Sequence, residues 1–303
     1  MTAIVGILNK RGVAIAADSA STLRNKIINS GNKMLRLSNK TPIAVMVVNN
    51  SSLAGMPWEV IIRWYRKELG DNQYDLLVDY ITDFLTFVQN KVLDRDDVPK
   101  EKARFGQDAI SYLVFAGYGI KEQLPSILEC EVYGINRREI LCQFVNGYEV
   151  STPDKDVVIY SEGQPDIVKA YIDGVINTRT NSIIDGHIEI LKNCIYELSP
   201  TLISSLSEDD IREKMKMTIE KCKKESVDAW LSTIRDYSLQ EMASLAENLI
   251  KATELHRKMM AEVEQVGGLI DLAIITKNDG FQWLNRKSWY VPSRGGQYGK
   301  FGI

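Results

Sequence analysis

Apolar and polar positions follow one another in short blocks over the first fifty residues, and these blocks predict a run of strands. Residues 2–8 and 13–17 are almost wholly apolar, and the polar residues 9–12 separate them. Runs of this length that are rich in Val, Ile and Ala and bounded by turn residues are typical of buried strands. We therefore expect a β-hairpin with Lys10 and Arg11 in its loop. Residues whose numbers sum to about 21 then face each other.

This hairpin returns the chain to its own beginning and brings a carboxylate close to Thr2. In a regular register residue 19 faces Thr2, and a one-residue bulge would place Asp18 there instead. Residues 33–37 form a third apolar segment with Lys33 at its head, and residues 43–48 form a fourth. The sequence thus predicts that Thr2, an acid and a base lie near one another.

Later segments show the periodicities of both helices and strands. A helix is expected to begin at Pro57, a favoured first helical position. Apolar residues recur every three or four positions in two further segments. Helices are expected over about 74–93 and from the turn 161–165 through about 176. A further helix is expected over 239–264, with Gly267 and Gly268 as the C-cap of that helix. Strands are expected over 111–117, 127–134, 140–145, 157–160, 269–276 and 281–284.

Two segments look additional to this alternation of sheets and helices. Residues 178–238 are charged and lack an obvious core, so we interpret them as a helical insertion packed on the same domain, shaping a pore or a partner surface. Solvated structural helices are the alternative. Ser207 is a good N-cap for a helix through Cys222 or beyond. The tail 293–303 is Gly-rich and expected to be flexible, with a docking peptide as the alternative.

Composition limits the classes of function. The chain has 303 residues, of which 45% are apolar and 25% charged, as in an ordinary globular protein. The net charge of −3 favours neither a nucleic-acid partner nor an anionic membrane. No apolar run reaches the length of a membrane span, and the first residues lack the charged region of a signal peptide. We therefore expect a cytoplasmic protein.

Cysteine and histidine spacing argues against a metal or a bound cofactor. The four cysteines are scattered without a C-x-x-C pair, and His187 and His256 lie far apart in the sequence. Such spacing is unlike that of zinc sites, and nothing implies the oxidising compartment that disulfides need. We expect no metal, no cofactor and reduced thiols.

A threonine at position two has a chemistry of its own if initiator Met1 is removed. The residue then carries a hydroxyl and a free α-amine, whose unperturbed pKa is about 7.7–8.0. An N-terminal Thr can thus supply nucleophile and base together. A nearby Lys would hold down the pKa of the amine by like-charge repulsion, and a carboxylate would keep that Lys charged and in place.

Three pieces of the sequence resemble the opening of proteasome β-subunits and of the bacterial proteasome-like peptidase that works with a ring ATPase. They are Thr2, the string Gly-Val-Ala-Ile-Ala-Ala-Asp-Ser over residues 12–19, and residues 33–37. The resemblance implies that Thr2 is the nucleophile, supported by Asp18 and Lys33. It also implies an α+β fold, the four-layer αββα sandwich of N-terminal-nucleophile hydrolases, as a single domain over residues 1–303. It is clear over residues 2–55, weaker over 111–176 and 239–284, and absent elsewhere.

The chain departs from the family pattern in three places. The family takes an oxyanion N–H from the end of the fourth strand, usually from a Gly, and the nearest residue here is Asn49, which could equally be an ordinary turn residue. The family has a Ser in a Gly-Ser-Gly turn where this chain has Glu162, either a hydrogen-bond acceptor or simply part of a helix N-terminus. Finally, Val263 and Val266 stand where the family has an Asp and a Ser near the nucleophile.

These features together predict a threonine-type peptidase that uses processed Thr2 as nucleophile and base, with the oxyanion bound near Asn49. The resemblance implies a peptide or unfolded-protein substrate, a self-compartmentalising homo-oligomeric ring and a ring ATPase that feeds it. A small-molecule amidase on the same fold is one alternative. A non-catalytic assembly subunit is another, and an intact Met1 would favour it.

Overall fold

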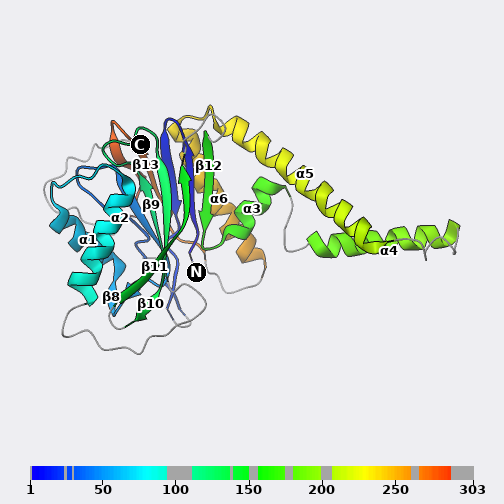
Figure 1. The fold of residues 1–303 in the computed structure, drawn as a ribbon, viewed down its shortest axis with the longest axis horizontal. Coiled ribbons are helices and arrows are strands. Elements are labelled where there is room, and N and C mark those ends of the chain that lie inside the picture. The colour runs from blue at the N-terminus through cyan, green and yellow to red at the C-terminus, as the bar shows by residue number, and fades with distance from the viewer. Residues whose placement is uncertain are drawn as a thin grey trace.

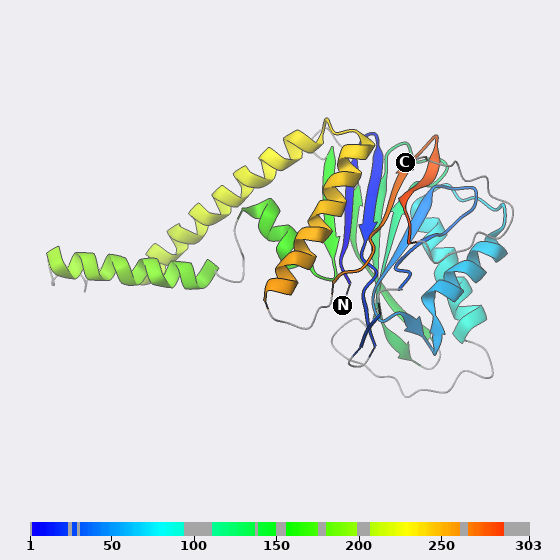
Figure 2. The ribbon, with the colours of Figure 1, turned by 180° about the vertical axis from the view of Figure 1, so that it is seen from behind.

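A computed structural model describes nine stretches of the chain. They are residues 2–23, 26–28, 31–93, 111–136, 139–149, 156–174, 180–198, 207–260 and 266–287. Figures 1 and 2 show their arrangement from the two sides. Met1, Val263 and the tail 293–303 lie outside the described residues, so the expectations about them stay predictions.

The first sheet contains the predicted hairpin. Its strand order is β12-β1-β2-β13-β14, with antiparallel neighbours throughout. Ile4 lies opposite Ala17 and Asn9 opposite Gly12, so facing residue numbers sum to 21 and the predicted register is confirmed. The strands are β1 (Ile4–Asn9), β2 (Gly12–Ala17), β12 (Val157–Glu162), β13 (Asp271–Thr276) and β14 (Gly280–Asn285).

The second sheet has the order β11-β10-β9-β6-β5, again antiparallel. Its members are β5 (Met34–Arg36), β6 (Ile43–Asn49), β9 (Ser111–Gly117), β10 (Ser126–Asn136) and β11 (Glu139–Glu149). Two short hairpins stand apart from both sheets: β3 (Ser21–Leu23) with β4 (Lys26–Ile28), and β7 (Ser52–Leu53) with β8 (Met56–Pro57).

Helices follow the predicted segments, with three differences at their ends. The segment expected as one helix over 74–93 is an α-helix followed by one short π-helix. The helix expected to reach residue 264 ends five residues earlier, and the helix expected to begin at Pro57 begins at Trp58, with Pro57 as its N-cap. The bounds are α1 (Trp58–Leu69), α2 (Leu77–Phe87), the π-helix η1 (Val88–Leu93), α3 (Pro165–Asp173), α4 (Thr180–Leu198), α5 (Glu208–Ile234) and α6 (Leu239–Met259).

Three apolar clusters hold the sheets and helices together. One joins the facing sides of the two sheets, for example Ile15 of β2 and Met46 of β6. A second packs α1 and α2 on the second sheet, with Tyr65 and Phe84 fully buried in it. The third packs α6 on the first sheet through residues such as Leu249. Burial of this apolar surface is the main stabilising term, and the result is a mixed α/β fold with antiparallel sheets.

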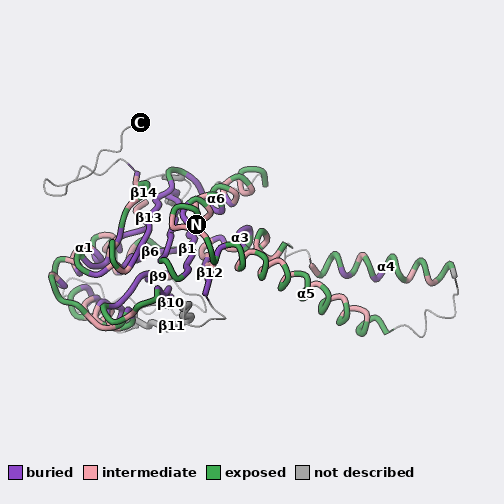
Figure 3. Tube along the Cα trace, turned by 90° about the horizontal axis from the view of Figure 1, so that it is seen from above, coloured by how far each residue is buried: buried purple, intermediate pink, exposed green. Residues whose placement is uncertain are grey.

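α4 and the outer part of α5 project from this body as an arm (Figures 1 and 3). Ser207 caps α5 as predicted, and its hydroxyl accepts a hydrogen bond from the Asp210 N–H at 3.3 Å. An ion pair of 2.7 Å between Arg212 and Asp185 links the two helices. The inner end of α5 packs on α3, where the Ser226 hydroxyl donates to the Ile172 carbonyl at 2.7 Å.

Candidate functional site

Asp18 and Lys33 form a buried ion pair that contacts Ala3, the residue after Thr2. The Lys33 Nζ lies 2.6 Å from the Asp18 Oδ1, and the same oxygen accepts a hydrogen bond from the Ala3 N–H at 2.8 Å. Thr2, Asp18 and Lys33 are 4%, 0% and 6% exposed. The Asp18 N–H donates to the Ala3 carbonyl at 3.1 Å, so the register stays regular and the bulge is not formed. The carboxylate therefore faces Ala3 and adjoins Thr2.

Asp18 is held by more donors than the sequence indicated. Its second oxygen, Oδ2, accepts hydrogen bonds from the N–H groups of Ala20 and Gly267, each at 3.2 Å. The Gly267 carbonyl accepts in turn from Ser19 and Ala20 at 3.2 and 3.0 Å. The prediction that Gly267 caps a helix is wrong, because α6 ends at Met259. Gly267 instead fixes the Asp18 carboxylate in position.

The strand β6 holds Lys33 in place from the second sheet. The Lys33 carbonyl accepts from the Val47 N–H at 2.8 Å, which extends the pairing of β5 with β6. Burial lowers the pKa of the Lys33 ammonium, the adjacent Asp18 carboxylate raises it, and the charge of Lys287 lowers it; burial has the largest effect. The pKa of Lys33 thus reflects two opposing effects, desolvation and the attraction of the Asp18 carboxylate.

Gly163 lies against the backbone of Thr2. Its φ of +86° is in the left-handed region, and a Cβ on this residue would be 2.0 Å from the Thr2 carbonyl oxygen. The register brings the two together, because Glu162 lies opposite Ile4. Glu162 is the last residue of β12 and accepts a hydrogen bond from the Gly163 N–H at 2.8 Å, whereas α3 begins only at Pro165. Glu162 is therefore an acceptor at the strand end, and its placement in a helix N-terminus is wrong.

Asn49 ends β6 two residues beyond the Val47 that contacts Lys33. It is exposed, and its φ of +68° is a left-handed conformation that Asn and Gly adopt far more readily than other residues. Asn49 thus holds a backbone conformation that Gly adopts without strain. Val266, at one of the two positions where the family has a polar residue, is buried in the apolar cluster under α6.

A second buried ion pair lies near the first and was not predicted. The Lys287 Nζ is 3.1 Å from the Asp271 Oδ2, and the Lys287 N–H donates to the Asp271 Oδ1 at 3.1 Å. Both residues are at most 5% exposed. Asp271 begins β13 and lies opposite Ala17, the residue before Asp18.

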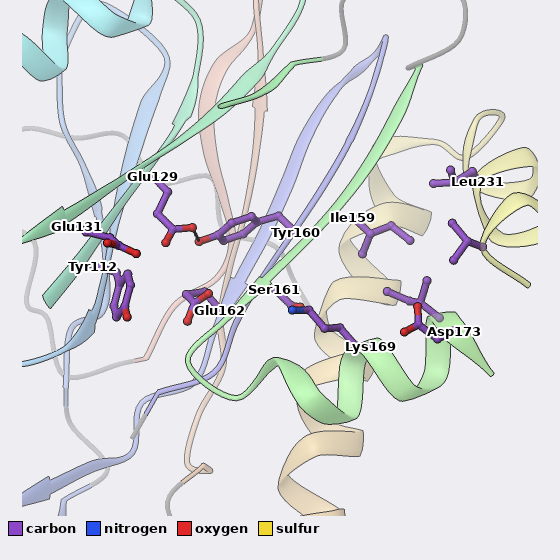
Figure 4. A pocket seen from close by; sticks show the side chains of 12 residues that line it. Tyr112, Glu129, Glu131, Ile159, Tyr160, Ser161, Glu162, Lys169, Asp173 and Leu231 are labelled. Atoms are coloured by element: carbon purple, nitrogen blue, oxygen red, sulfur yellow. Dashed lines mark hydrogen bonds between the residues drawn. The ribbon is translucent and has the colours of Figure 1, made fainter. Parts of the chain in front are cut away.

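Between the sheets and α3 lies a cavity of about 490 Å³, a volume within the range of ligand pockets (Figure 4). Tyr112, Glu129, Glu131 and Glu162 lie at one end of the cavity, and Ile159, Lys169, Asp173 and Leu231 lie toward the other. The Tyr160 hydroxyl donates to the Glu129 Oε2 at 2.7 Å. Burial raises the pKa of the Glu129 carboxyl, and the charges of Glu162 and Glu131 raise it further. Glu162 directly precedes Gly163, the residue that lies against the Thr2 carbonyl.

Comparisons with known proteins give resemblance at the level of three-dimensional structure alone. No protein-family model matches the chain, and no curated protein matches it. Among solved structures, Anbu from Hyphomicrobium sp. strain MC1 is 14% identical, with a TM-score of 0.46 over 93% of this chain and 85% of that chain. A mutant of the same protein gives 0.48, at 14% identity over 94% and 85%. Anbu, an ancestral beta-subunit, from Yersinia bercovieri gives 0.47, at 14% identity over 94% and 87%. The proposals below rest on the geometry of this chain.

Within the described stretches, no group of three or more His, Cys, Asp and Glu side chains is arranged to hold a metal ion. None of the helices that the structure describes is long and apolar enough to cross a membrane. Cys130, Cys194 and Cys222 are free thiols.

The sequence indicates Thr2, Asp18, Lys33 and Asn49 as candidates, and the structure brings Asp18 and Lys33 together next to Thr2. The sequence does not indicate the contacts of Gly163, Gly267 and the pair of Asp271 with Lys287. The missed residues lie more than 120 residues away from Lys33 in the chain, so no local spacing relates them to the site. One signal was available. Gly163 follows a predicted strand, and an isolated Gly at such a point is typical of a close backbone approach.

Proposed function

We propose that the chain is a threonine-type peptidase in which Thr2, exposed as the N-terminus by removal of Met1, is both nucleophile and base. The buried ion pair of Asp18 and Lys33 next to Thr2 carries the proposal, because burying two charged groups is costly and buried ionisable groups cluster at functional sites. We further propose that the two sheets and their flanking helices are the four-layer αββα sandwich of N-terminal-nucleophile hydrolases, as one domain with an inserted helical arm.

In the proposed reaction the Thr2 Oγ1 attacks the carbonyl carbon of a peptide bond. The α-amine of Thr2 takes the hydroxyl proton, directly or through a water molecule, and returns a proton to the leaving amine. This leaves an ester on Thr2 and releases the C-terminal part of the peptide. Water then hydrolyses the ester and restores the hydroxyl. Backbone N–H groups near Asn49 stabilise the oxyanion of each tetrahedral intermediate.

Lys33 and Asp18 prepare the amine for this role. A charged Lys33 next to the amine disfavours protonation of that amine, so the neutral form persists near pH 7. The contact with Asp18 holds the ammonium of Lys33 in place and offsets the effect of burial on its pKa. The four donors on Asp18 leave its carboxylate no freedom to turn away.

The substrate in this proposal is a peptide or an unfolded protein, and the cavity in Figure 4 is large enough for a peptide side chain. The protein is cytoplasmic and forms a homo-oligomeric ring, which a ring ATPase supplies with unfolded chains. Exposed apolar residues on the arm, such as Ile190 and Tyr196, offer contact surface for such an assembly. Light scattering that gives only monomers at micromolar concentration would contradict the ring.

A non-catalytic assembly subunit is the second candidate. The apolar burial of Val266 favours it, because the corresponding family position carries a polar side chain close to the nucleophile. The two candidates differ at the first residue of the mature protein, since only a free Thr2 amine can act as base.

Intact-mass spectrometry of the protein from its native host, followed by peptide turnover, tests the proposal. We expect the mass of a chain that begins at Thr2 and cleavage of a fluorogenic peptide. Thr2→Ala should abolish cleavage with the fold unchanged, whereas Thr2→Ser should keep measurable activity because it retains hydroxyl and amine. Retention of Met1, or an equally active Thr2→Ala protein, would refute the catalytic proposal. Cleavage of short amides without cleavage of unfolded proteins would indicate an amidase.

A further inference from the structure

Lys287 is buried, charged and close to the proposed site, yet the reaction proposed above does not use it. It follows β14 near the end of the described residues and is 5% exposed. Burying an ammonium in this way is costly unless its charge is paired and its N–H groups are hydrogen-bonded. The environment of Lys287 meets both conditions and connects it to Lys33.

The partner of Lys287 is Asp271, on the strand next to the hairpin of Thr2. Asp271 lies opposite Ala17 at the start of β13, so its carboxylate and that of Asp18 leave neighbouring strands at the same end of the sheet. Asp271 binds Lys287 through both the Nζ and the backbone N–H. The Lys287 side chain is thus anchored at two points to the first sheet.

From this anchor the ammonium reaches the segment that leads into Lys33. The Lys287 Nζ donates a hydrogen bond to the Gly31 carbonyl, two residues before Lys33. The Gly31 N–H donates to the Ser19 carbonyl at 3.1 Å, and Ser19 follows Asp18. Gly31 is therefore bound on one side by the residue after Asp18 and on the other by Lys287. These two hydrogen bonds fix the position of the backbone before Lys33 relative to Asp18.

The geometry points to Lys287 as a positioning residue for Lys33: its ammonium, anchored by Asp271, holds the Gly31 carbonyl and places a second positive charge beside the Asp18–Lys33 pair. This inference rests on the proposed function for its catalytic consequence, but the placement of the two lysines does not. Lys287 touches no reacting atom in the proposed mechanism and acts through Lys33.

The positive charge of Lys287 changes the pKa of Lys33 in a predictable direction. Two charged groups near Lys33 act in opposite directions: Asp18 favours its protonated form, and Lys287 disfavours it. Removing the charge of Lys287 therefore raises the pKa of Lys33. The proposed peptidase needs a charged Lys33, so the alkaline limb of its pH–rate profile should move to higher pH. Loss of the Gly31 contact should also lower the maximal rate, by about tenfold if Lys33 is displaced by a fraction of an ångström.

Lys287→Met tests this, with Lys277→Met as the matched control. Lys277 lies in the turn between β13 and β14, at the opposite end of β13 from Asp271, and its Nζ donates to the carbonyls of Gly119 and Ile120 at 2.7 Å each. The control removes the same group and the same kind of contact away from the site. We expect Lys277→Met to leave the pH–rate profile unchanged.

An NMR titration of lysine side chains labelled at Cε provides a readout that needs no activity. The resonance lost in Lys33→Met belongs to Lys33, and its titration midpoint should rise in Lys287→Met but not in Lys277→Met. An unchanged midpoint would overturn the inference whatever the activity of the protein. A raised midpoint in a protein that cleaves no peptide would uphold the placement of Lys287 and refute the proposed function.

Lys287→Met leaves Asp271 buried without its partner and could prevent folding. The double variant Asp271→Leu/Lys287→Met removes both charges, a replacement that buried ion pairs often tolerate. The Lys33 midpoint should rise less in this variant than in Lys287→Met, because loss of the Asp271 carboxylate acts in the opposite direction. A midpoint that rises as far as in Lys287→Met would overturn the inference that Asp271 and Lys287 act on Lys33 together.

Discussion

The α-carbon of Gly163 faces the carbonyl of Thr2 so closely that any side chain on residue 163 would collide with it. A Cβ there would lie 2.0 Å from the Thr2 oxygen and 3.3 Å from the Val48 Cγ1. The collision is with backbone rather than with the end of a flexible side chain. Residue 163 therefore sets where the proposed nucleophile can lie.

Gly163→Ala should displace Thr2 and reduce turnover by at least tenfold, because displacements of about 1 Å can cost about a hundredfold. Gly280→Ala is the matched control. Its φ of +79° carries the same backbone strain, but nothing lies within 4 Å of a Cβ there. We expect the control to lose about 1 kcal/mol of stability and no activity per folded molecule. Turnover of a fluorogenic peptide and urea denaturation of both variants measure the difference, and equal activities would contradict the role of Gly163.

Lys33→Ala should lower turnover by two or more powers of ten, since base function alone is worth about 10²–10⁴-fold. Burial adds a second effect, because Asp18 is left charged and unpaired in the interior. The free energy of unfolding should therefore fall by several kcal/mol, toward the roughly 3–5 kcal/mol seen when buried pairs are broken. Activity must be measured per folded molecule, in conditions where thermal denaturation shows the variant folded.

Lys33→Arg should rescue little activity, since a planar guanidinium does not replace a compact ammonium. Asp18→Asn should lower turnover in the same direction. The control is Lys251→Ala, which breaks the surface pair with Glu247 on α6 and should change stability by about 0.3–0.5 kcal/mol. Turnover of Lys33→Ala within threefold of wild type would exclude the proposed role of Lys33.

Asn49→Gly should retain activity, because Gly keeps the backbone N–H and adopts the φ of +68° without strain. Asn49→Val should lose both stability and turnover, since a β-branched residue is strained in this conformation. The pair of variants separates a backbone role in the oxyanion site from a side-chain role. A large loss of turnover in Asn49→Gly, measured at equal stability, would assign the role to the amide side chain instead.

Glu129→Gln should make the protein more stable at neutral pH. Burial raises the pKa of Glu129 in the folded state above its ordinary value of 4.5, so the folded state favours the protonated carboxyl. The associated stability is present below pH 4.5 and is lost as the pH rises through the folded-state pKa. A glutamine can still accept from the Tyr160 hydroxyl but never ionises. Urea denaturation from pH 4 to 8 should show the variant gaining on wild type with rising pH, and a constant difference would contradict this.

Local pattern predicted the hairpin, its register and most strands, because each depends on residues close in sequence. Alternation and turn chemistry are sufficient to bring Asp18 beside Ala3. The pairing of Lys33 with Asp18 needed the family resemblance, since nothing local relates a strand-end lysine to the preceding hairpin. The structure gives the distance of 2.6 Å that spacing could not.

Long-range contacts account for what the sequence did not predict. Gly267 reaches Asp18 across 249 residues, and Lys287 reaches Gly31 across 256. Periodicity continues past Met259, where the helix ends, and therefore predicts a helix cap at Gly267. Such contacts depend on the packing of whole sheets, which local pattern does not determine.

The contact between Asp18 and Gly267 also bears on when the protein could become active during its synthesis. The hairpin of Thr2 is synthesised before β13, Gly267 and Lys287. At about 5–20 residues per second, the intervening 249 residues take about 10–50 seconds to translate. During that interval a nascent chain contains Thr2, Asp18 and Lys33 but lacks Gly267 and Lys287, which hold Asp18 and Lys33 in position. We therefore expect a ribosome-bound chain to be unable to cleave its neighbours, because the last strands complete the site.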